Sequence, residues 1–379
     1  MPPWYYPAEA FDRVYALSDL HGDVDVAILL FRDVMGAVGP GGDDDWLWTA
    51  PPRTCIVVCG DVVDRSRDAG HGGPEYGEND WQPDVPDDLY LLRLLNEWAR
   101  LADEADTGGC VLRLLGNHDF NGAITTSECV TAHSLQLLWE LEQQDGADPE
   151  ANRCASFSTP GAAFFDAIWD APSVRLLVQI GPYLFAHAGV SMATVSLLDG
   201  NGGSVDELLR AVREAMCARG SKGLEVGIAD VMQMRLHTVA APCPGDLAAQ
   251  ILRHFSEAVA TEPVHTLVTG HNTTTPLMCH RHAESCQVHT RRVDADDRRA
   301  VFDTLGPYQP GGPWINASMS DPQGLFPGGD AVVWRLDVGA TRAWCTSSPD
   351  WEVWPQVLGI RPATGETQTL MASQPMAAR

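Results

Sequence analysis

The stretch Gly60-Asp61-Val62-Val63-Asp64-Arg65 decides the fold, because it follows directly on the apolar run Cys55–Cys59. A short apolar run with β-branched residues, bounded by a glycine, predicts a buried strand that ends in a turn. This turn carries two carboxylates and a guanidinium. In α/β proteins, ligands bind beyond the carboxyl ends of the strands. The stretch therefore predicts a strand-end functional site.

Four further stretches repeat this arrangement, in which an apolar strand is followed by metal-binding side chains. They are Ser18-Asp19-Leu20-His21-Gly22, Gly116-Asn117-His118-Asp119, His187-Ala188-Gly189 and Gly270-His271. Carboxylate, amide and imidazole donors without cysteine are typical of sites for Mn²⁺, Fe or Zn²⁺. We therefore predict a centre of two divalent metal ions, with Mn²⁺ expected and Fe or Zn²⁺ as the alternatives.

Predicted strands alternate with amphipathic helices along the chain. We expect helices at Val24–Gly36, Leu89–Ala102, Ser127–Gln144, Val205–Ala218 and Leu247–Ala260, and strands before each of the five polar stretches. This alternation, followed by a run of short strands, predicts an α/β protein with a sheet core and flanking helices. We expect one domain over residues 8–361, surface insertions near 36–52 and 66–86, and a flexible tail over 362–379.

The polar stretches resemble the motifs of calcineurin-like metallophosphoesterases. Within that superfamily the chain is similar to phosphoprotein phosphatases, especially the Shewanella-like branch. Two later segments, Val333–Gly339 and Gln356–Leu358, also resemble the pattern of that branch. The resemblance spans roughly residues 12–360. It implies a four-layer α/β/β/α sandwich with mixed sheets, and a metal-dependent phosphatase.

The resemblance also implies how the metal ligands are shared. One ion would be held by Asp19, His21 and Asp61, and its neighbour by Asp61, Asn117, His187 and His271. Asp61 is the natural bridge, because a carboxylate can give one oxygen to each ion. Two ions ~3.5–4 Å apart can lower the pKa of a shared water, and the resulting hydroxide would attack phosphorus.

The remaining polar residues suit the other steps of phosphate-ester hydrolysis. His118 follows the ligand Asn117 and is our candidate for the general acid that protonates the leaving group. Asp64 would hold its imidazole. Arg65 and Asn117 would bind the phosphoryl oxygens, and Arg235 is our candidate for a second arginine at the phosphate.

Three functions remain open on the sequence. The first is a phosphomonoesterase acting on phospho-Ser/Thr, or phospho-Tyr, of a protein. The second is a nucleoside polyphosphate hydrolase similar to symmetrical diadenosine tetraphosphatases, a group that usually lacks the acid found here as Asp64. The third is a catalytically silent scaffold, which the intact ligand set argues against. A separate zinc site is a weaker hypothesis, because the spacing of Cys279, His280, His282, Cys286 and His289 fits no regular pattern.

Composition limits the partners. The net charge of −26 over 379 residues argues against a nucleic-acid surface, where clustered Lys and Arg neutralise phosphates. Nothing in the sequence reaches the ~20 apolar residues of a membrane helix, and Met1–Pro7 lacks the features of a signal peptide. The ten cysteines are scattered, several of them in predicted core strands. We therefore expect a cytoplasmic monomer that acts on a phosphorylated protein or other phosphate ester.

Overall fold

The computed structural model describes most of the chain, in twelve segments. These are residues 4–41, 45–64, 87–123, 149–169, 173–220, 224–233, 244–271, 278–281, 284–287, 291–293, 332–336 and 355–372. All structural statements below concern these residues.

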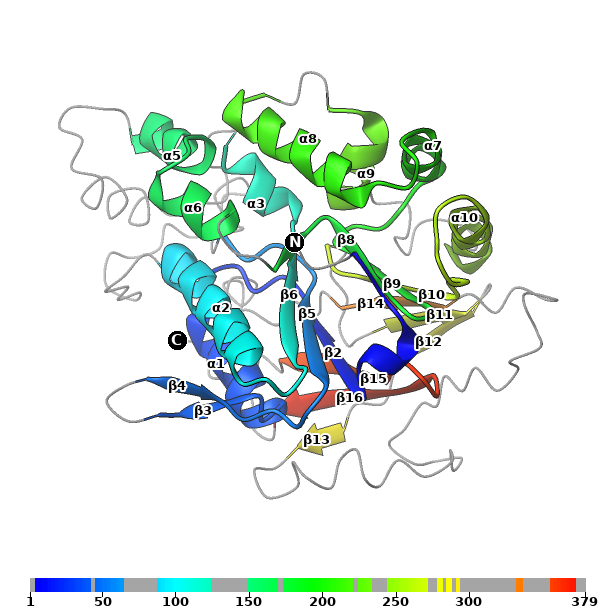
Figure 1. The fold of residues 1–379 in the computed structure, drawn as a ribbon, viewed down its shortest axis with the longest axis horizontal. Coiled ribbons are helices and arrows are strands. Elements are labelled where there is room, and N and C mark those ends of the chain that lie inside the picture. Colours follow the sequence, from blue (N-terminus) through cyan, green and yellow to red (C-terminus); the bar gives the residue numbers. More distant parts are fainter. Residues whose placement is uncertain are drawn as a thin grey trace.

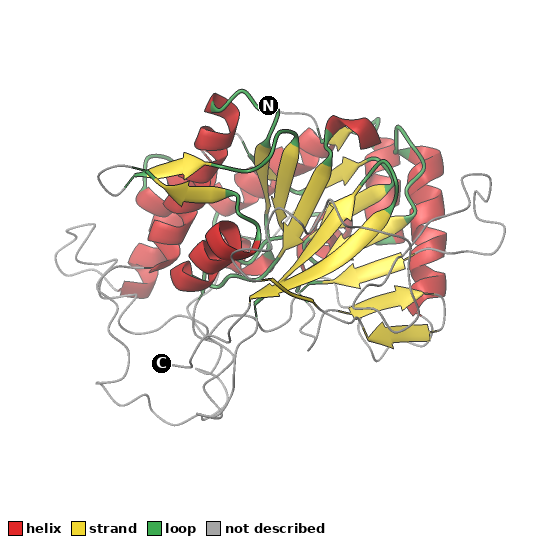
Figure 2. Cartoon of the chain, turned by 90° about the horizontal axis from the view of Figure 1, so that it is seen from below, coloured by secondary structure: helices red, strands yellow, loops and turns green. Residues whose placement is uncertain are grey.

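Two seven-stranded mixed sheets form the centre of the molecule (Figures 1 and 2). One has the order β1 (Tyr5–Tyr6), β8 (Leu177–Ile180), β9 (Tyr183–Ala186), β10 (Thr266–Thr269), β14 (Val332–Arg335), β11 (Met278–Arg281), β12 (Glu284–Gln287). The other has the order β13 (Arg291–Val293), β16 (Glu366–Ala372), β15 (Gln356–Arg361), β2 (Arg13–Leu17), β5 (Thr54–Val58), β6 (Cys110–Leu114), β7 (Val174–Arg175). A small antiparallel ribbon joins β3 (Val38–Pro40) and β4 (Trp46–Trp48).

Helices flank the two sheets, some on the outer faces and others at one end (Figure 1). They are α1 (Val24–Ile28), which continues as a π-helical turn (Leu29–Val34), α2 (Asp87–Glu104), α3 (Asn117–Asn121), α5 (Pro149–Ser158), α6 (Ala163–Trp169), α7 (Met192–Gly200), α8 (Val205–Cys217), α9 (Val226–Gln233) and α10 (Pro244–Ala258), with a 3₁₀ turn at Ala8–Ala10. Helix α2 packs on β6, and α10 packs on β10 and β14 of the other sheet. The predicted α/β/β/α layering is confirmed (Figure 1).

The alternation of side chains along each strand explains the layers. Val57 of β5 and Phe185 of β9 belong to the apolar cluster between the two sheets. Their neighbours Ile56 and Leu184 belong to the cluster that includes the helices. Successive side chains of a strand point to opposite faces, and a strand covered on both faces is apolar throughout. This is why the site-bearing strands read as continuous apolar runs.

Strand direction brings the polar stretches to one edge of the sandwich. Strands β2, β5 and β6 run parallel in one sheet, and β9 and β10 run parallel in the other. Parallel neighbours end on the same side. Helices α3, α5, α6 and α8 lie at the end where β6 leads into α3 (Figure 1).

Two expectations about the periphery are corrected. The surface insertion expected at 36–52 is not merely an irregular excursion, because it contains the β3–β4 ribbon, whose Trp46 packs edge-on to Trp98 of α2 at 5.6 Å between ring centres. The expected flexible tail is partly ordered, because Glu366–Ala372 forms β16 in an antiparallel pair with β15. That pairing depends on a partner strand, so a search for local apolar periodicity misses it. The segment 66–86 and the helix expected at 127–144 lie outside the described residues.

No helix in the described part of the chain is both long enough and apolar enough to cross a membrane.

Candidate metal and phosphate site

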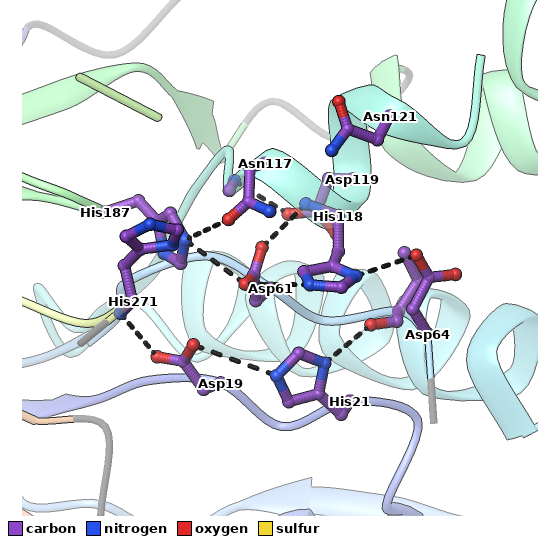
Figure 3. Close-up of polar contacts among 12 residues, drawn as sticks. Asp19, His21, Asp61, Asp64, Asn117, His118, Asp119, Asn121, His187 and His271 are labelled. Atoms are coloured by element: carbon purple, nitrogen blue, oxygen red, sulfur yellow. Dashed lines mark hydrogen bonds and ion pairs between the residues drawn. The ribbon is translucent and has the colours of Figure 1, made fainter. Parts of the chain in front are cut away.

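Asp61 lies at the centre of a polar cluster formed by the five strand-end stretches (Figure 3). Its carboxylate belongs to two groups of ligand atoms, each within 4.8 Å of one another: one with His21 and His118, the other with His187 and His271. A carboxylate shared by two donor groups matches the bridging position expected from the sequence. The donor set is made of hard oxygen and imidazole ligands, which fits two divalent ions.

Asp19 and Asn117 lie beside the same groups. Oδ1 of Asp19 is 3.8 Å from Nε2 of His21, and its Oδ2 accepts a hydrogen bond from the backbone N–H of His271 at 3.1 Å. Oδ1 of Asn117 is 3.1 Å from Nε2 of His187. The structure therefore brings together all six residues expected to be metal ligands.

Two of the histidines are oriented by backbone carbonyls. Nδ1 of His21 donates to the carbonyl of Val63 at 3.0 Å, and Nδ1 of His187 donates to the carbonyl of Cys59 at 2.6 Å. Because a carbonyl only accepts, each of these bonds requires a proton on Nδ1, so that Nε2 is the nitrogen directed into the cluster. Such outer hydrogen bonds are typical of histidines that bind metal ions.

Backbone hydrogen bonds hold the stretches in register. The N–H groups of Asp19 and His21 donate to the carbonyls of Gly60 and Asp61 at 3.1 and 3.0 Å. The N–H of Gly270 donates to the carbonyl of His187 at 2.8 Å. The ligand-bearing turns are therefore tied to one another as well as to their own strands.

The turns adopt backbone conformations that most residues avoid. Eight described non-glycine residues have positive φ, and five of them belong to this cluster: Asp19, His21, Asp61, Asp64 and His271. Such conformations cost of order 1–3 kcal/mol each and concentrate at functional sites. Their clustering here supports a functional role for this edge of the sandwich.

Two glycines allow the turns to approach closely. Gly60 has φ of +85°, and a Cβ atom there would lie 2.8 Å from Cα of Gly116. A Cβ atom on Gly116 would lie 2.2 Å from Oδ1 of Asp61. Both glycines of the paired motifs are therefore required by the space available, which explains why each motif begins with one.

His118 and Asp64 form a hydrogen-bonded pair next to the metal-ligand cluster. Nδ1 of His118 lies 2.9 Å from Oδ2 of Asp64, and Nε2 lies 3.9 Å from Oδ2 of Asp61. The N–H of His118 also donates to Oδ1 of Asp61 at 2.9 Å. The imidazole is thus held by Asp64 on one side and faces the cluster with the other nitrogen.

Charges within the cluster shift the pKa values of its members. Burial opposes the charged form of His187, but the Asp61 carboxylate 3.2 Å away, together with Asp19 and the Cys59 carbonyl, outweighs it and raises the pKa of His187 to about 9. Burial alone would raise the pKa of Asp61, but the surrounding imidazoles, His187 first, hold it well below its usual range. A negative charge centred on Asp61 attracts cations.

Asp119 has a supporting position. Its Oδ1 accepts from the N–H of Val62 at 3.2 Å and its Oδ2 from the N–H of Gly116 at 2.9 Å, so it links two of the turns. Burial, with a contribution from Asp61, raises the pKa of Asp119 to about 6. These two hydrogen bonds give Asp119 an orienting role between the turns.

Arg65 and Arg235 lie outside the described residues, so their roles stay predictions. The described segments that precede these two arginines end close to the cluster, at Asp64 and at Gln233. Asp64 directly precedes Arg65, and the carbonyl of Val231 in α9 accepts from the N–H of Ala188, next to His187, at 2.8 Å. Nε2 of Gln233 lies 3.5 Å from Oδ1 of Asn121 in α3.

Two charged residues near the site were missed by the sequence analysis. Arg153 of α5 forms an ion pair with Asp64, and Asp88 of α2 accepts a hydrogen bond from the N–H of Asp64 at 3.3 Å. Neither residue belongs to a strand-end stretch. A helical arginine with no recognisable motif gives no local sign that it reaches a residue 89 positions earlier.

Known proteins resemble this chain over nearly its whole length in structure, but over only part of its length in sequence. No family model matches the chain. An uncharacterised protein of Schizosaccharomyces pombe is 36% identical over 110 residues, which span 29% of this chain and 26% of that protein. The chain thus matches about a quarter of the length of this curated relative.

Solved structures match nearly the whole chain. A cold-active protein tyrosine phosphatase is similar with a TM-score of 0.54, 15% identity, and coverage of 98% of this chain and 82% of that one. The cold-active protein tyrosine phosphatase of a psychrophilic Shewanella species gives a TM-score of 0.52, 16% identity, and coverage of 97% and 82%. At this identity the likeness concerns the fold. The chain shares the fold of these two phosphatases.

Proposed function

We propose that this protein is a phosphomonoesterase of the Shewanella-like phosphoprotein phosphatase type, with two divalent metal ions and a phosphorylated protein side chain as substrate. The observation that carries the proposal is the His118–Asp64 pair at 2.9 Å, directly beside the two donor groups that share Asp61. A proton donor at His118 would therefore lie next to the candidate metal centre. The similarity in fold to protein tyrosine phosphatases supports the same class of reaction.

The residues at the cluster fit two ions. Asp19, His21 and Asp61 would hold one, and Asp61, Asn117, His187 and His271 the other, with Mn²⁺ expected and Fe or Zn²⁺ as alternatives. When bound, such a pair of ions acts as a Lewis acid that activates water and neutralises charge on a transferring phosphoryl group. The lowered pKa of Asp61 keeps the central carboxylate ionised near neutral pH.

His118 would act as the general acid. The bond from Nδ1 to Asp64 leaves Nε2 as the nitrogen that can give a proton to a departing alkoxide. His118 also belongs to a donor group with His21 and Asp61, so it could instead be a metal ligand. The variant His118→Asn separates these roles. If His118 is the general acid, the variant loses activity and retains both metal ions. If His118 is a ligand, the metal content of the variant falls.

Arg65 and Arg235 would bind the phosphate. A guanidinium can donate two parallel hydrogen bonds to phosphoryl oxygens. Arg65 directly follows Asp64, and Arg235 follows the end of α9, which is hydrogen-bonded beside His187. Both lie within a few residues of described atoms of the cluster.

The second candidate is a nucleoside polyphosphate hydrolase similar to symmetrical diadenosine tetraphosphatases. Asp64 favours the monoesterase, because it supplies the partner of His118. An alkoxide leaving group requires protonation, whereas a nucleotide phosphate is already a good leaving group and gains less from an acid. Phosphopeptide turnover by the wild type that falls sharply on Asp64→Asn substitution would therefore support the monoesterase.

The deciding experiment measures phosphate release by metal-stripped protein reloaded with Mn²⁺. Parallel reactions contain Ser-, Thr- and Tyr-phosphorylated peptides, or diadenosine tetraphosphate with a coupled phosphatase. We expect metal-dependent turnover of the peptides, abolished in Asp61→Asn. Turnover of the nucleotide alone would establish the second candidate, and bound metal with no turnover of any substrate would indicate a silent scaffold.

A further inference from the structure

Arg153 is a buried arginine at the edge of the site, in a helix that carries none of the site motifs. Its side chain is 5% exposed, and its Nη2 pairs with Oδ1 of Asp64, whose side chain is 6% exposed. The other oxygen of Asp64 faces Nδ1 of His118 at 2.9 Å. The two oxygens of Asp64 are therefore divided between a guanidinium and an imidazole.

The guanidinium of Arg153 is itself held in place by aromatic packing. Its Cζ atom lies 4.6 Å from the centre of the Phe157 ring. That ring stacks on Phe164, with centres 4.4 Å apart and an angle of 18° between the planes. Stacking on an aromatic face restricts the planar guanidinium and suits arginine rather than lysine.

The same aromatic ring joins α5 to the helix that carries His118. Gly122 follows α3, and a Cβ atom there would lie 2.4 Å from Cδ1 of Phe157. Backbone and ring are thus in tight contact. Arg153 and His118 approach Asp64 from two helices that pack against each other at this point.

We propose that Arg153 is a positioning residue, which fixes the Asp64 carboxylate so that its Oδ2 atom accepts from Nδ1 of His118 and Nε2 of His118 faces the substrate. The inference rests on the proposed phosphatase function. Because Arg153 is buried and engaged by Asp64 and Phe157, it acts through Asp64 and does not touch the substrate.

The charge of Arg153 matters as well as its shape. A buried carboxylate needs a compensating charge, and His118 becomes neutral once it has given up a proton. Arginine stays charged under all conditions in which proteins fold. Arg153 therefore offers the Asp64 carboxylate a fixed positive partner both before and after the proton is transferred.

The test compares phosphate esters whose leaving groups differ in their need for a proton. Arg153→Met removes both the charge and the planar guanidinium group, whereas Arg153→Lys keeps the charge alone. Arg219→Met is the matched control. Nε of Arg219 donates at 2.9 Å to Ser158 of α5, the helix that carries Arg153, and this bond does not involve Asp64. Each Mn²⁺-loaded protein is assayed on p-nitrophenyl phosphate and on a phosphoserine peptide, after folding and metal content have been checked.

General acid catalysis contributes about 10²–10⁴-fold, so misplacing the acid should lower kcat by roughly 10- to 100-fold on the peptide. We expect less than about threefold on p-nitrophenyl phosphate, whose leaving group needs little protonation. The KM and the metal content should stay unchanged. Arg153→Lys should recover part of the loss, and Arg219→Met should match the wild type on both substrates.

A second readout does not depend on turnover. In metal-stripped protein, the ¹⁵N signals of the His118 imidazole should show a proton on Nδ1 in the wild type and a mixture of tautomers in Arg153→Met. Equal losses on both substrates, unchanged kcat on the peptide, or an unchanged tautomer would overturn the proposal. If Arg153→Met does not fold, Arg153→Lys replaces it, with a selective loss of about three- to tenfold expected. If the wild type hydrolyses neither ester, the proposed function fails, and the imidazole signals still decide whether Arg153 positions Asp64.

Discussion

The stability of the metal-stripped protein should fall as the pH rises from 6.5 to 9. The cause is His187, a buried imidazole whose pKa is raised from its ordinary value of 6.5 to about 9, chiefly by Asp61 acting against the effect of burial. Between these pH values the folded protein holds a proton on His187 that the unfolded chain has lost. Stability therefore falls with increasing pH in this window. The contribution is fully present below pH 6.5.

The size of the effect follows from the same pKa values. One pKa unit corresponds to about 1.4 kcal/mol, so the shift of His187 contributes up to about 3 kcal/mol to the free energy of unfolding at low pH. Buried thiols act in the same direction near the top of the window, because burial raises the pKa values of Cys55 and Cys59. A reference variant is therefore needed to isolate the histidine.

The assay is urea unfolding in the presence of a chelator at pH 6.0, 7.5 and 9.0, on the wild type and on Asp61→Asn. Asparagine keeps an oxygen that can accept from the N–H of His118 but removes the charge that holds the proton on His187. We expect the wild type to lose about 3 kcal/mol across the window and the variant to lose much less. Equal slopes for the two proteins, or rising stability of the wild type with pH, would refute this reasoning. With Mn²⁺ in excess the trend should reverse, because metal binding requires the neutral imidazole.

Three further predictions concern single residues of the site. Gly116→Ala should lower Mn²⁺ content measured by elemental analysis, since the added Cβ would lie 2.2 Å from Oδ1 of Asp61; full occupancy would contradict the close packing of these turns. Asp64→Asn should keep both metal ions and lower kcat on phosphoserine peptides by about 10²-fold, with a smaller loss on p-nitrophenyl phosphate; a uniform loss would argue against its role in holding His118. Arg235→Ala should raise the KM for phosphopeptides, and steady-state kinetics identical to the wild type would exclude this residue from phosphate binding.

Much of the fold could be predicted from local patterns. The strand ending at Val58 and the turn after it are encoded side by side, because apolar residues bury a strand and glycine permits the tight turn. The same holds for the strands before Asn117, His187 and His271. The helix predicted at 89–102 is present as α2, because its apolar residues recur at helical spacing. Ordered segments without such patterns were missed, and β16 is the clearest case.

The sequence by itself determined the ligand types and their strand-end positions, since both are local properties. It placed the expected ligands, Asp61 and His187 among them, in five separate turns. Parallel strand direction then required those turns to meet at one edge of the sandwich. Only the tertiary structure decided which side chains touch across the site. The pairing of Arg153 with Asp64 depends on how α5 packs against α3 through Phe157 and Gly122. Such a contact is set by the packing of distant elements, so neither residue shows it in its own stretch of sequence.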